Sequence, residues 1–216
     1  MRALLLLVVS LAFVAGCVGG GDDTTTESVA TSADGCTSVD APAPRDPESL
    51  KAPTAALDAS KTYTLTFVTS CGSFTVTLDP ELAPKTTASL VALARAGYYD
   101  DTIFHRVVPG FVVQGGDPTQ SGSGGPGYTT VDVPPSDAAY TKGVVAMAKS
   151  GVEAPGTAGS QFFVVTGDDA GLPPEYAIVG KVTEGMDTVQ RINALGVADG
   201  PPSKPVVVTS VTVRES

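Results

Sequence analysis

From Tyr63 onwards the chain consists of short runs of β-branched, aromatic and other apolar residues, divided by turns that contain glycine or proline. In the first two runs, YTLTFVTS and SFTVTL, apolar and polar residues alternate, and Cys71-Gly72 lies between them. Alternation with a period of two around a short turn predicts a β-hairpin. Similar runs continue to the end of the chain: TIFHRVV, FVVQGG, GVVAMA, SQFFVV, YAIVGKV and PVVVTSVTV. Many short strands joined by such turns favour a closed antiparallel barrel over a doubly wound α/β sheet.

Two segments carry a helical pattern instead. In DPELAPKTTASLVALARAGYY, Pro84 suits the first turn of a helix, and Leu90 and Leu93 fall on one face of it. Gly97 follows as a plausible C-terminal stop. A second short helix is predicted from about 186 to 192, with an acidic residue near its positive N-terminal end.

Residues 1–16 have the features of a secretory signal peptide. Arg2 gives a charged start, and the apolar run that follows is too short to span a bilayer. The run ends in Val-Ala-Gly before Cys17, which resembles a bacterial lipobox, where the cysteine is lipidated and becomes the new N-terminus. We expect lipidation of Cys17; the alternative is an ordinary cleavage site with an incidental cysteine.

Residues 17–60 are predicted to be a flexible tether between this anchor and the domain. The segment contains many Gly, Asp, Thr, Ser and Pro residues and few large apolar ones, a composition that opposes compact packing. The protein would then lie on the extracytoplasmic face of the cell membrane and contact that membrane only through its N-terminal lipid.

Export also bears on the remaining thiols, Cys36 and Cys71. In an oxidising compartment an even pair suggests a disulfide, although the sequence leaves two unpaired thiols as an alternative. Their spacing is not that of metal ligands, and the chain has a single histidine, so no metal site is expected. The formal net charge of −10 and the lack of a basic cluster argue against nucleic-acid partners.

Several blocks of sequence, in this order, resemble the cyclophilin family of peptidyl-prolyl isomerases. The resemblance covers roughly residues 61–216 and implies an eight-stranded, closed antiparallel β-barrel capped by two α-helices. The matching blocks are FHRVVPGFVVQGGD at 104–117, GSGGPGY at 122–128, KGVVAMAKSG at 142–151, AGSQFFVVT at 158–166 and YAIVGKVTEGMD at 176–187.

Carried over residue by residue, the resemblance makes Arg106 the catalytic arginine. The residues that it assigns to the proline pocket or the adjoining substrate groove are Phe111, Val112, Gln114, Ala148, Lys149, Gln161, Phe163, Leu172 and Tyr176.

Three positions depart from the best-known pattern of the family. Gly171 stands where many members have tryptophan, Tyr176 where many have histidine, and Lys149 where asparagine is usual. The missing indole makes tight binding of cyclosporin-type drugs doubtful. It affects the expectation of catalysis less, because the arginine and the apolar residues remain.

The implied reaction is rotation about an X-Pro peptide bond, which is slow because rotation destroys amide resonance. No bond breaks, so neither a nucleophile nor a cofactor is required. A donor such as Arg106, aimed at the nitrogen of the twisted amide, would bind the transition state better than the planar one. His105 should point to the opposite face of the same strand and be structural.

We therefore expect a monomeric prolyl isomerase that acts on proline-containing segments of exported polypeptides. The alternative is a chaperone or scaffold that binds such segments on the cell surface without useful turnover. A solute-binding lipoprotein is a third option, against which the short single domain argues.

Overall fold

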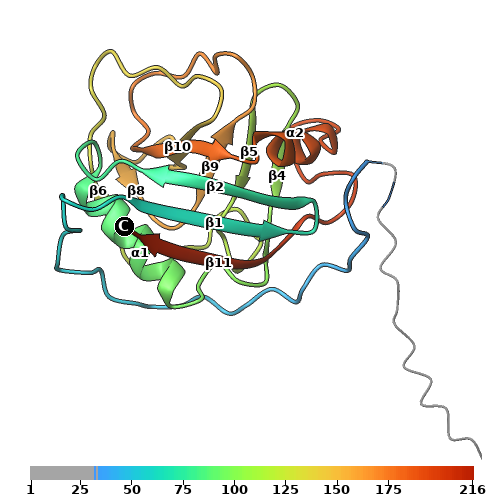
Figure 1. Ribbon diagram of the computed structural model, residues 1–216, viewed down its shortest axis with the longest axis horizontal. Helices are drawn as coiled ribbons and strands as arrows, with labels where there is room; N and C mark the ends of the chain where they lie inside the picture. Colours follow the sequence, from blue (N-terminus) through green and yellow to red (C-terminus); the bar gives the residue numbers. More distant parts are fainter. Residues whose placement is uncertain (1–31, 33) are drawn as a thin grey trace, which may run out of the picture.

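The computed structural model describes residue 32 and residues 34–216. The predicted signal peptide and the lipidation site at Cys17 lie outside these described residues. Within them, the chain forms a mostly β domain with two helices, as predicted (Figure 1).

Nine strands form one curled sheet in the order β3-β11-β1-β2-β10-β7-β9-β5-β4, and β6 pairs separately with β8. All of the strand pairs are antiparallel. The strands are β1 (Tyr63–Thr69), β2 (Gly72–Leu78), β3 (Thr102–Ile103), β4 (Arg106–Val108), β5 (Val112–Gly115), β6 (Thr130–Val131), β7 (Val144–Met147), β8 (Thr157–Ala158), β9 (Phe162–Val165), β10 (Ile178–Glu184) and β11 (Val207–Glu215).

The prediction of a closed eight-stranded barrel is wrong, because the sheet is open between β3 and β4. These two edge strands are short, and they are consecutive in the chain, separated by Phe104 and His105. One continuous segment therefore pairs first with β11 and then with β5. Because β4 follows directly after β3 in the chain, these two edge strands do not pair with each other through hydrogen bonds. The sheet therefore stays open between them.

Both helices lie where the sequence predicts them. The first, α1 (Pro84–Arg95), has proline in its first turn, and Gly97 follows its end with a φ of +69°. The amide of Gly97 donates to the carbonyl of Ala94, and the amide of Tyr98 donates to that of Leu93. This pattern is a Schellman motif, which favours glycine because of its left-handed conformation. The second helix, α2 (Met186–Ala194), has Asp187 in its first turn.

The strands β5, β7 and β9 are buried on both faces, and this explains their near-continuous apolar sequences. In β9, Phe162 and Val164 point into the main core, whereas Phe163 and Val165 belong to a second cluster on the other face. Phe162 packs against an aromatic group formed by Phe67, Tyr99 and Phe104. The second cluster includes Val112, Tyr140, Val144, Ala146, Phe163 and Val165.

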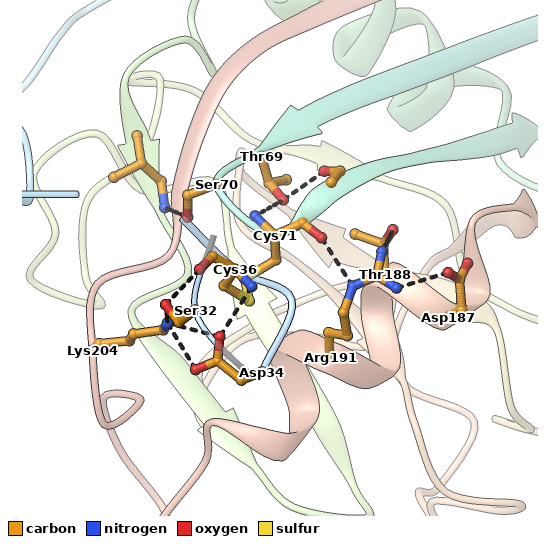
Figure 2. Close-up of a disulfide and its surroundings, with 12 residues drawn as sticks. Ser32, Asp34, Cys36, Thr69, Ser70, Cys71, Asp187, Thr188, Arg191 and Lys204 are labelled. Carbon is orange, nitrogen blue, oxygen red and sulfur yellow. Dashed lines mark hydrogen bonds and ion pairs between the residues drawn. A yellow bond between two sulfur atoms is a disulfide. The ribbon is translucent and has the colours of Figure 1, made fainter. Parts of the chain in front are cut away.

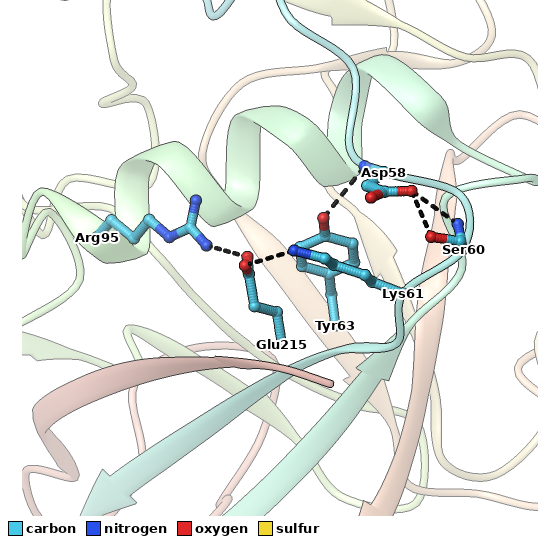
Figure 3. Close-up of polar contacts among 6 residues, drawn as sticks. All are labelled: Asp58, Ser60, Lys61, Tyr63, Arg95 and Glu215. Atoms are coloured by element: carbon cyan, nitrogen blue, oxygen red, sulfur yellow. Dashed lines mark hydrogen bonds and ion pairs between the residues drawn. The ribbon is translucent and has the colours of Figure 1, made fainter.

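An ion-pair cluster ties the last strand to α1 and to the start of β1 (Figure 3). Glu215 accepts hydrogen bonds from Lys61 Nζ at 3.0 Å and from Arg95 Nη2 at 2.6 Å. Nearby, the hydroxyl of Tyr63 accepts a hydrogen bond from the amide of Asp58 at 3.1 Å. Since these charged groups are partly exposed, solvent screens each pair and its contribution to stability is small.

We call residues 34–60 the N-terminal strap, because this segment runs along the outside of the domain (the blue to cyan segment in Figure 1). The amide of Thr37 donates to the carbonyl of Ser70 at 2.7 Å. Further along, the amide of Arg45 donates to the carbonyl of Pro118 at 2.9 Å, and its guanidinium donates to the carbonyl of Tyr98. The sequence predicts a flexible tether over 17–60; its described part is instead held against the domain by backbone hydrogen bonds.

A disulfide joins the strap to the turn between β1 and β2 (Figure 2). Cys36 and Cys71, the two bonded residues, are both buried. Lys204 makes an ion pair with Asp34 at 2.7 Å on the strap side of the bond. On the domain side, Arg191 Nε donates to the carbonyl of Cys71 at 3.1 Å.

We predict that the double substitution Cys36→Ala/Cys71→Ala destabilises the domain. The two cysteines are 35 residues apart, and a cross-link over such a loop stabilises by about 3–4 kcal/mol, mainly through the entropy of the unfolded chain. Urea unfolding of the double variant should therefore show a lower midpoint than that of the wild type. A reductant should lower the midpoint of the wild type and leave that of the variant unchanged. Equal midpoints for the wild type and the double variant in the absence of reductant would contradict this prediction.

Candidate peptide-binding site

The antiparallel pairing of β4 with β5 brings a charged and an amide side chain together on the sheet. Arg106 lies directly opposite Gln114 in the register. Beside them is a cavity of about 230 Å³. Its lining residues are Arg106, Phe111, Val112, Gln114, Ala148, Lys149, Phe163, Leu172 and Tyr176.

This set contains all but one of the site residues that the sequence predicts. The exception, Gln161, lines a second, neighbouring cavity. It remains linked to the first one, because Gln114 Nε2 donates to Gln161 Oε1 at 3.0 Å. Gln161 Nε2 in turn donates to the carbonyl of Gly124 at 3.0 Å. This chain of amides fixes the orientation of Gln114.

The guanidinium of Arg106 is held on several sides. Its Nε donates to Asp199 Oδ1 at 2.5 Å and its Nη2 donates to Asp199 Oδ2 at 3.0 Å. Its Nη1 donates to Gln114 Oε1 at 3.2 Å. The charged carbon lies 5.9 Å from the centre of the Phe111 ring, within the range of a cation–π contact.

A count of donors shows what remains for a bound molecule. A guanidinium has five N–H groups, and the contacts with Asp199 and Gln114 use one on Nε, one on Nη1 and one on Nη2. One N–H on each terminal nitrogen is therefore left without a partner among the described residues. Since Arg106 lines the cavity, these donors are available to a polar group bound there.

The floor of the cavity belongs to the second apolar cluster. Val112 and Phe163 are buried within that cluster, and Phe111 and Leu172 pack against it from partly exposed positions. The ring of Phe163 meets that of Tyr176 edge to face, with 5.7 Å between their centres. Such a surface suits a small apolar ring better than a charged or extended polar group.

A buried tyrosine holds the far wall of the cavity in place. The hydroxyl of Tyr140 donates to the carbonyl of Tyr176 at 2.8 Å and accepts from the amide of Tyr176 at 3.0 Å.

Gly171 stands where many members of the family that the sequence resembles have tryptophan. Its φ is +61°, and a β-carbon placed there would meet no atom within 4 Å. The space immediately beside Gly171 is therefore open.

Lys149 lines the cavity, but its charge is already neutralised. Its side chain is only 2% exposed and makes an ion pair with Glu175 at 3.0 Å. The same ammonium donates to the carbonyls of Ser150 and Glu153 and lies 5.4 Å from the ring centre of Tyr176. Two of the three N–H donors of the ammonium are used by these carbonyls, and the ion pair with Glu175 balances its charge. Lys149 therefore shapes the wall through its alkyl stem and does not offer a free cation.

His105 does not line the cavity that contains Arg106. Neither of its ring nitrogens has a hydrogen-bond partner among the described residues. Burial lowers the pKa of His105 below its ordinary value. The imidazole is therefore neutral at physiological pH, because burial disfavours the charged form of the ring.

Asp199 is the site residue that the sequence analysis did not find. It lies in the loop after α2, far along the chain from Arg106, and outside every matching block. The hydrogen bonds from Arg106 lower the pKa of the Asp199 carboxyl, which keeps it ionised at neutral pH. A lone acid in a Gly/Pro-rich loop carries no sequence signal for this role.

No group of three or more His, Cys, Asp or Glu side chains within the described chain is placed to hold a metal ion. Over the same residues, no helix has the length and apolarity needed to cross a membrane.

Comparisons with known proteins agree with the geometry. Residues 64–213 match the family described as "Cyclophilin type peptidyl-prolyl cis-trans isomerase/CLD". The chain is 37% identical over 170 residues to "Probable peptidyl-prolyl cis-trans isomerase A" of Mycobacterium leprae, a match that covers 69% of this chain and 91% of that one. It is 40% identical over 164 residues to "Peptidyl-prolyl cis-trans isomerase-like 2" of Cryptococcus neoformans, covering 72% of this chain but only 28% of that longer protein.

Among solved structures, the chain is similar to a cyclophilin-type peptidyl-prolyl cis-trans isomerase of Cryptosporidium parvum crystallised in the presence of the dipeptide Ala-Pro. The TM-score is 0.64 at 30% sequence identity, and the match covers 70% of this chain and 98% of that one. Both the extent of the family match and these identities lead to one conclusion. The chain belongs to the family of cyclophilin-type peptidyl-prolyl cis-trans isomerase enzymes.

Proposed function

We propose that this protein accelerates the cis/trans isomerisation of X-Pro bonds in polypeptides, with Arg106 as the catalytic residue. The observation that carries the proposal is the fixed guanidinium with two unused donors beside an apolar cavity of about 230 Å³. A proline ring fits the apolar floor, and its amide would then lie next to the donors.

The barrier to this reaction, about 18–20 kcal/mol, arises from the partial double bond of the amide. An apolar pocket that excludes water withdraws hydrogen bonds from the partly charged oxygen of the planar amide, which weakens resonance. As the amide twists, the lone pair localises on its nitrogen. A donor from Arg106 then binds the twisted amide more strongly than the planar one, which lowers the barrier.

The neighbouring groups would keep that donor in place during the rotation. Gln114 and Asp199 together fix the plane of the guanidinium, so little reorientation is needed at the transition state. Gln161, held through Gly124 and Gln114, is positioned to bind substrate backbone in the adjoining groove.

A second candidate function is binding of proline-containing segments without useful turnover, as a chaperone or scaffold. Gly171, next to the lining residue Leu172, favours it, because glycine has no side chain with which to enclose the pocket, and a less enclosed pocket excludes water less well. Turnover of a short X-Pro peptide separates the two functions, since only an enzyme increases the rate of isomerisation at catalytic concentration.

The proposed location is the extracytoplasmic face of the cell membrane, with a lipid on Cys17 and exported polypeptides as substrates. The Val-Ala-Gly-Cys sequence supports lipidation. The disulfide between Cys36 and Cys71 supports an oxidising compartment, because such bonds are rare in the cytosol. A monomer that needs no cofactor and binds cyclosporin-type drugs poorly remains our expectation.

Arg106→Ala should lower kcat/KM for a short X-Pro peptide by at least about tenfold, because a preorganised transition-state donor is lost. His105→Gln should retain activity, since His105 does not line the cavity. Arg95→Ala serves as a matched control, because Arg95 lies on α1 and pairs with Glu215. A coupled isomerisation assay gives the rates, and circular dichroism verifies the fold. Equal losses for Arg106→Ala and His105→Gln would refute the assignment.

Asp199→Asn should reduce kcat by about two- to fivefold with little change in KM, because an exposed, solvent-screened ion pair has a modest effect and acts here on the transition state. Asp199→Glu should partly restore kcat, and the difference from wild type should shrink at high salt. Asp137→Asn, at an exposed acid outside the cavity, is the control. An Asp199→Asn variant as active as the wild type would show that Asp199 does not position Arg106.

Intact mass spectrometry tests the anchor. After expression in a bacterium that processes lipoproteins, the mature chain should begin at Cys17 and carry the mass of a lipid. A Cys17→Ala variant should lack that mass and should leave the detergent phase in a partition experiment. An unlipidated wild-type chain that begins elsewhere would rule the anchor out.

A further inference from the structure

A second cavity adjoins the first and is larger, with a volume of about 920 Å³. The two share Gln114, Ala148 and Lys149 in their walls, so they form one continuous groove. A polypeptide whose proline occupied the smaller cavity would place neighbouring residues in the larger one. The side chains of that cavity would then contact the residues that flank the proline.

Part of this cavity is built by the N-terminal strap. Pro47 and Glu48 belong to its lining, together with the loop that contains Gly122 and Gly124. The matched family domain begins only at residue 64. This wall is therefore an addition to the family domain, supplied by a segment that the sequence predicts to be a free tether.

Hydrogen bonds on both sides of Pro47 and Glu48 hold the strap in this position. Before them, Gln120 Nε2 donates to the carbonyl of Pro42 at 2.9 Å, and the amide of Arg45 donates to that of Pro118 at 2.9 Å. After them, the amide of Leu50 donates to the carbonyl of Pro126 at 2.7 Å.

The strap also packs closely on Gly127, which stands opposite Ser49. A β-carbon on Gly127 would lie 2.7 Å from the Cα of Ser49 and 3.0 Å from the carbonyl oxygen of Glu48. The φ of Gly127 is +83°, a conformation that also favours glycine. This contact allows the backbone of the strap to approach the groove without an intervening side chain.

The charges in the cavity are unbalanced. Its lining contains the acids Glu48 and Glu153 and a single cation, Lys149. That cation is already paired with Glu175 outside the lining. The surplus of negative charge attracts a positive side chain and repels an acidic one.

We propose that the strap forms part of the substrate groove, and that Glu48 directs the enzyme towards proline-containing segments with Lys or Arg close to the proline. This inference rests on the proposed function, because it concerns the substrates of the same site. The cavity is partly open to solvent and its acids are not fully buried, so the preference is modest, about two- to fivefold, as for exposed ion pairs.

The test uses peptides that share one X-Pro core and carry Lys, Gln or Glu at a position one or two residues from the proline, on either side. Both kcat/KM and the dissociation constant, from fluorescence anisotropy, are measured at low and high salt. The wild type should prefer Lys over Gln and Gln over Glu, and salt should reduce the difference. The variant Glu48→Lys should abolish or invert the ratio between the Lys and Glu peptides.

Asp46→Lys is the matched control, because it makes the same change of charge on the same strap. Asp46 is exposed and does not line the cavity, so this variant should keep the wild-type ratio. Equal use of the three peptides by the wild type would overturn the inference, as would the same change of ratio in both variants. Failure of the wild type to turn over the Gln peptide would overturn only the proposed enzymatic activity, since the binding constants still report the preference.

Discussion

The burial of β5, β7 and β9 on both faces is the constraint on which the rest of the structure depends. One face of these strands fills the main core, and the other face supplies the apolar floor of the proposed proline pocket. Because successive strand residues point to opposite sides, Phe162 and Phe163 are adjacent in the chain but serve these different purposes. The floor is consequently part of the same packed strands as the core, and a one-residue change of register in β9 would exchange the two faces.

A single charge at the edge of this apolar floor needs support from its surroundings. Arg106 lies on β4, the short edge strand at the open side of the sheet. The amide of the adjacent Val107 donates to the carbonyl of Gly200 in the loop after α2, and β4 pairs with a single strand, β5. Gln114 on that strand and Asp199 on a distant loop complete the support. The carboxylate partly neutralises the guanidinium and weakens its attraction for a substrate. The contacts with Asp199 and Gln114 together use three of the five donors and leave the remaining two in fixed directions, which suits a reaction that depends on the direction of one hydrogen bond.

Local patterns were sufficient to predict most of this fold. The β-hairpin, the two helices and the stop at Gly97 follow from periodicity and from turn chemistry, which act over a few residues. The residues of the pocket followed from a family resemblance, and nearly all of them line one cavity. The open edge between β3 and β4, the partner of Arg106 and the course of the strap could not be predicted in this way. Each depends on contacts between segments far apart in the chain, such as Arg106 with Asp199 or Leu50 with Pro126.

The strap shows why composition alone misjudges such a segment. Its prolines and its scarcity of large apolar residues indicate that it cannot form a core of its own, and in the structure it forms none. Order comes from the domain instead: the disulfide fixes one end, and backbone hydrogen bonds at Arg45 and Leu50 hold the middle. Proline suits this role, because a residue with a restricted φ loses less entropy when it is ordered. A segment of this kind can therefore act as part of a binding groove at little conformational cost, and one of its attachments, the disulfide, is sensitive to redox conditions.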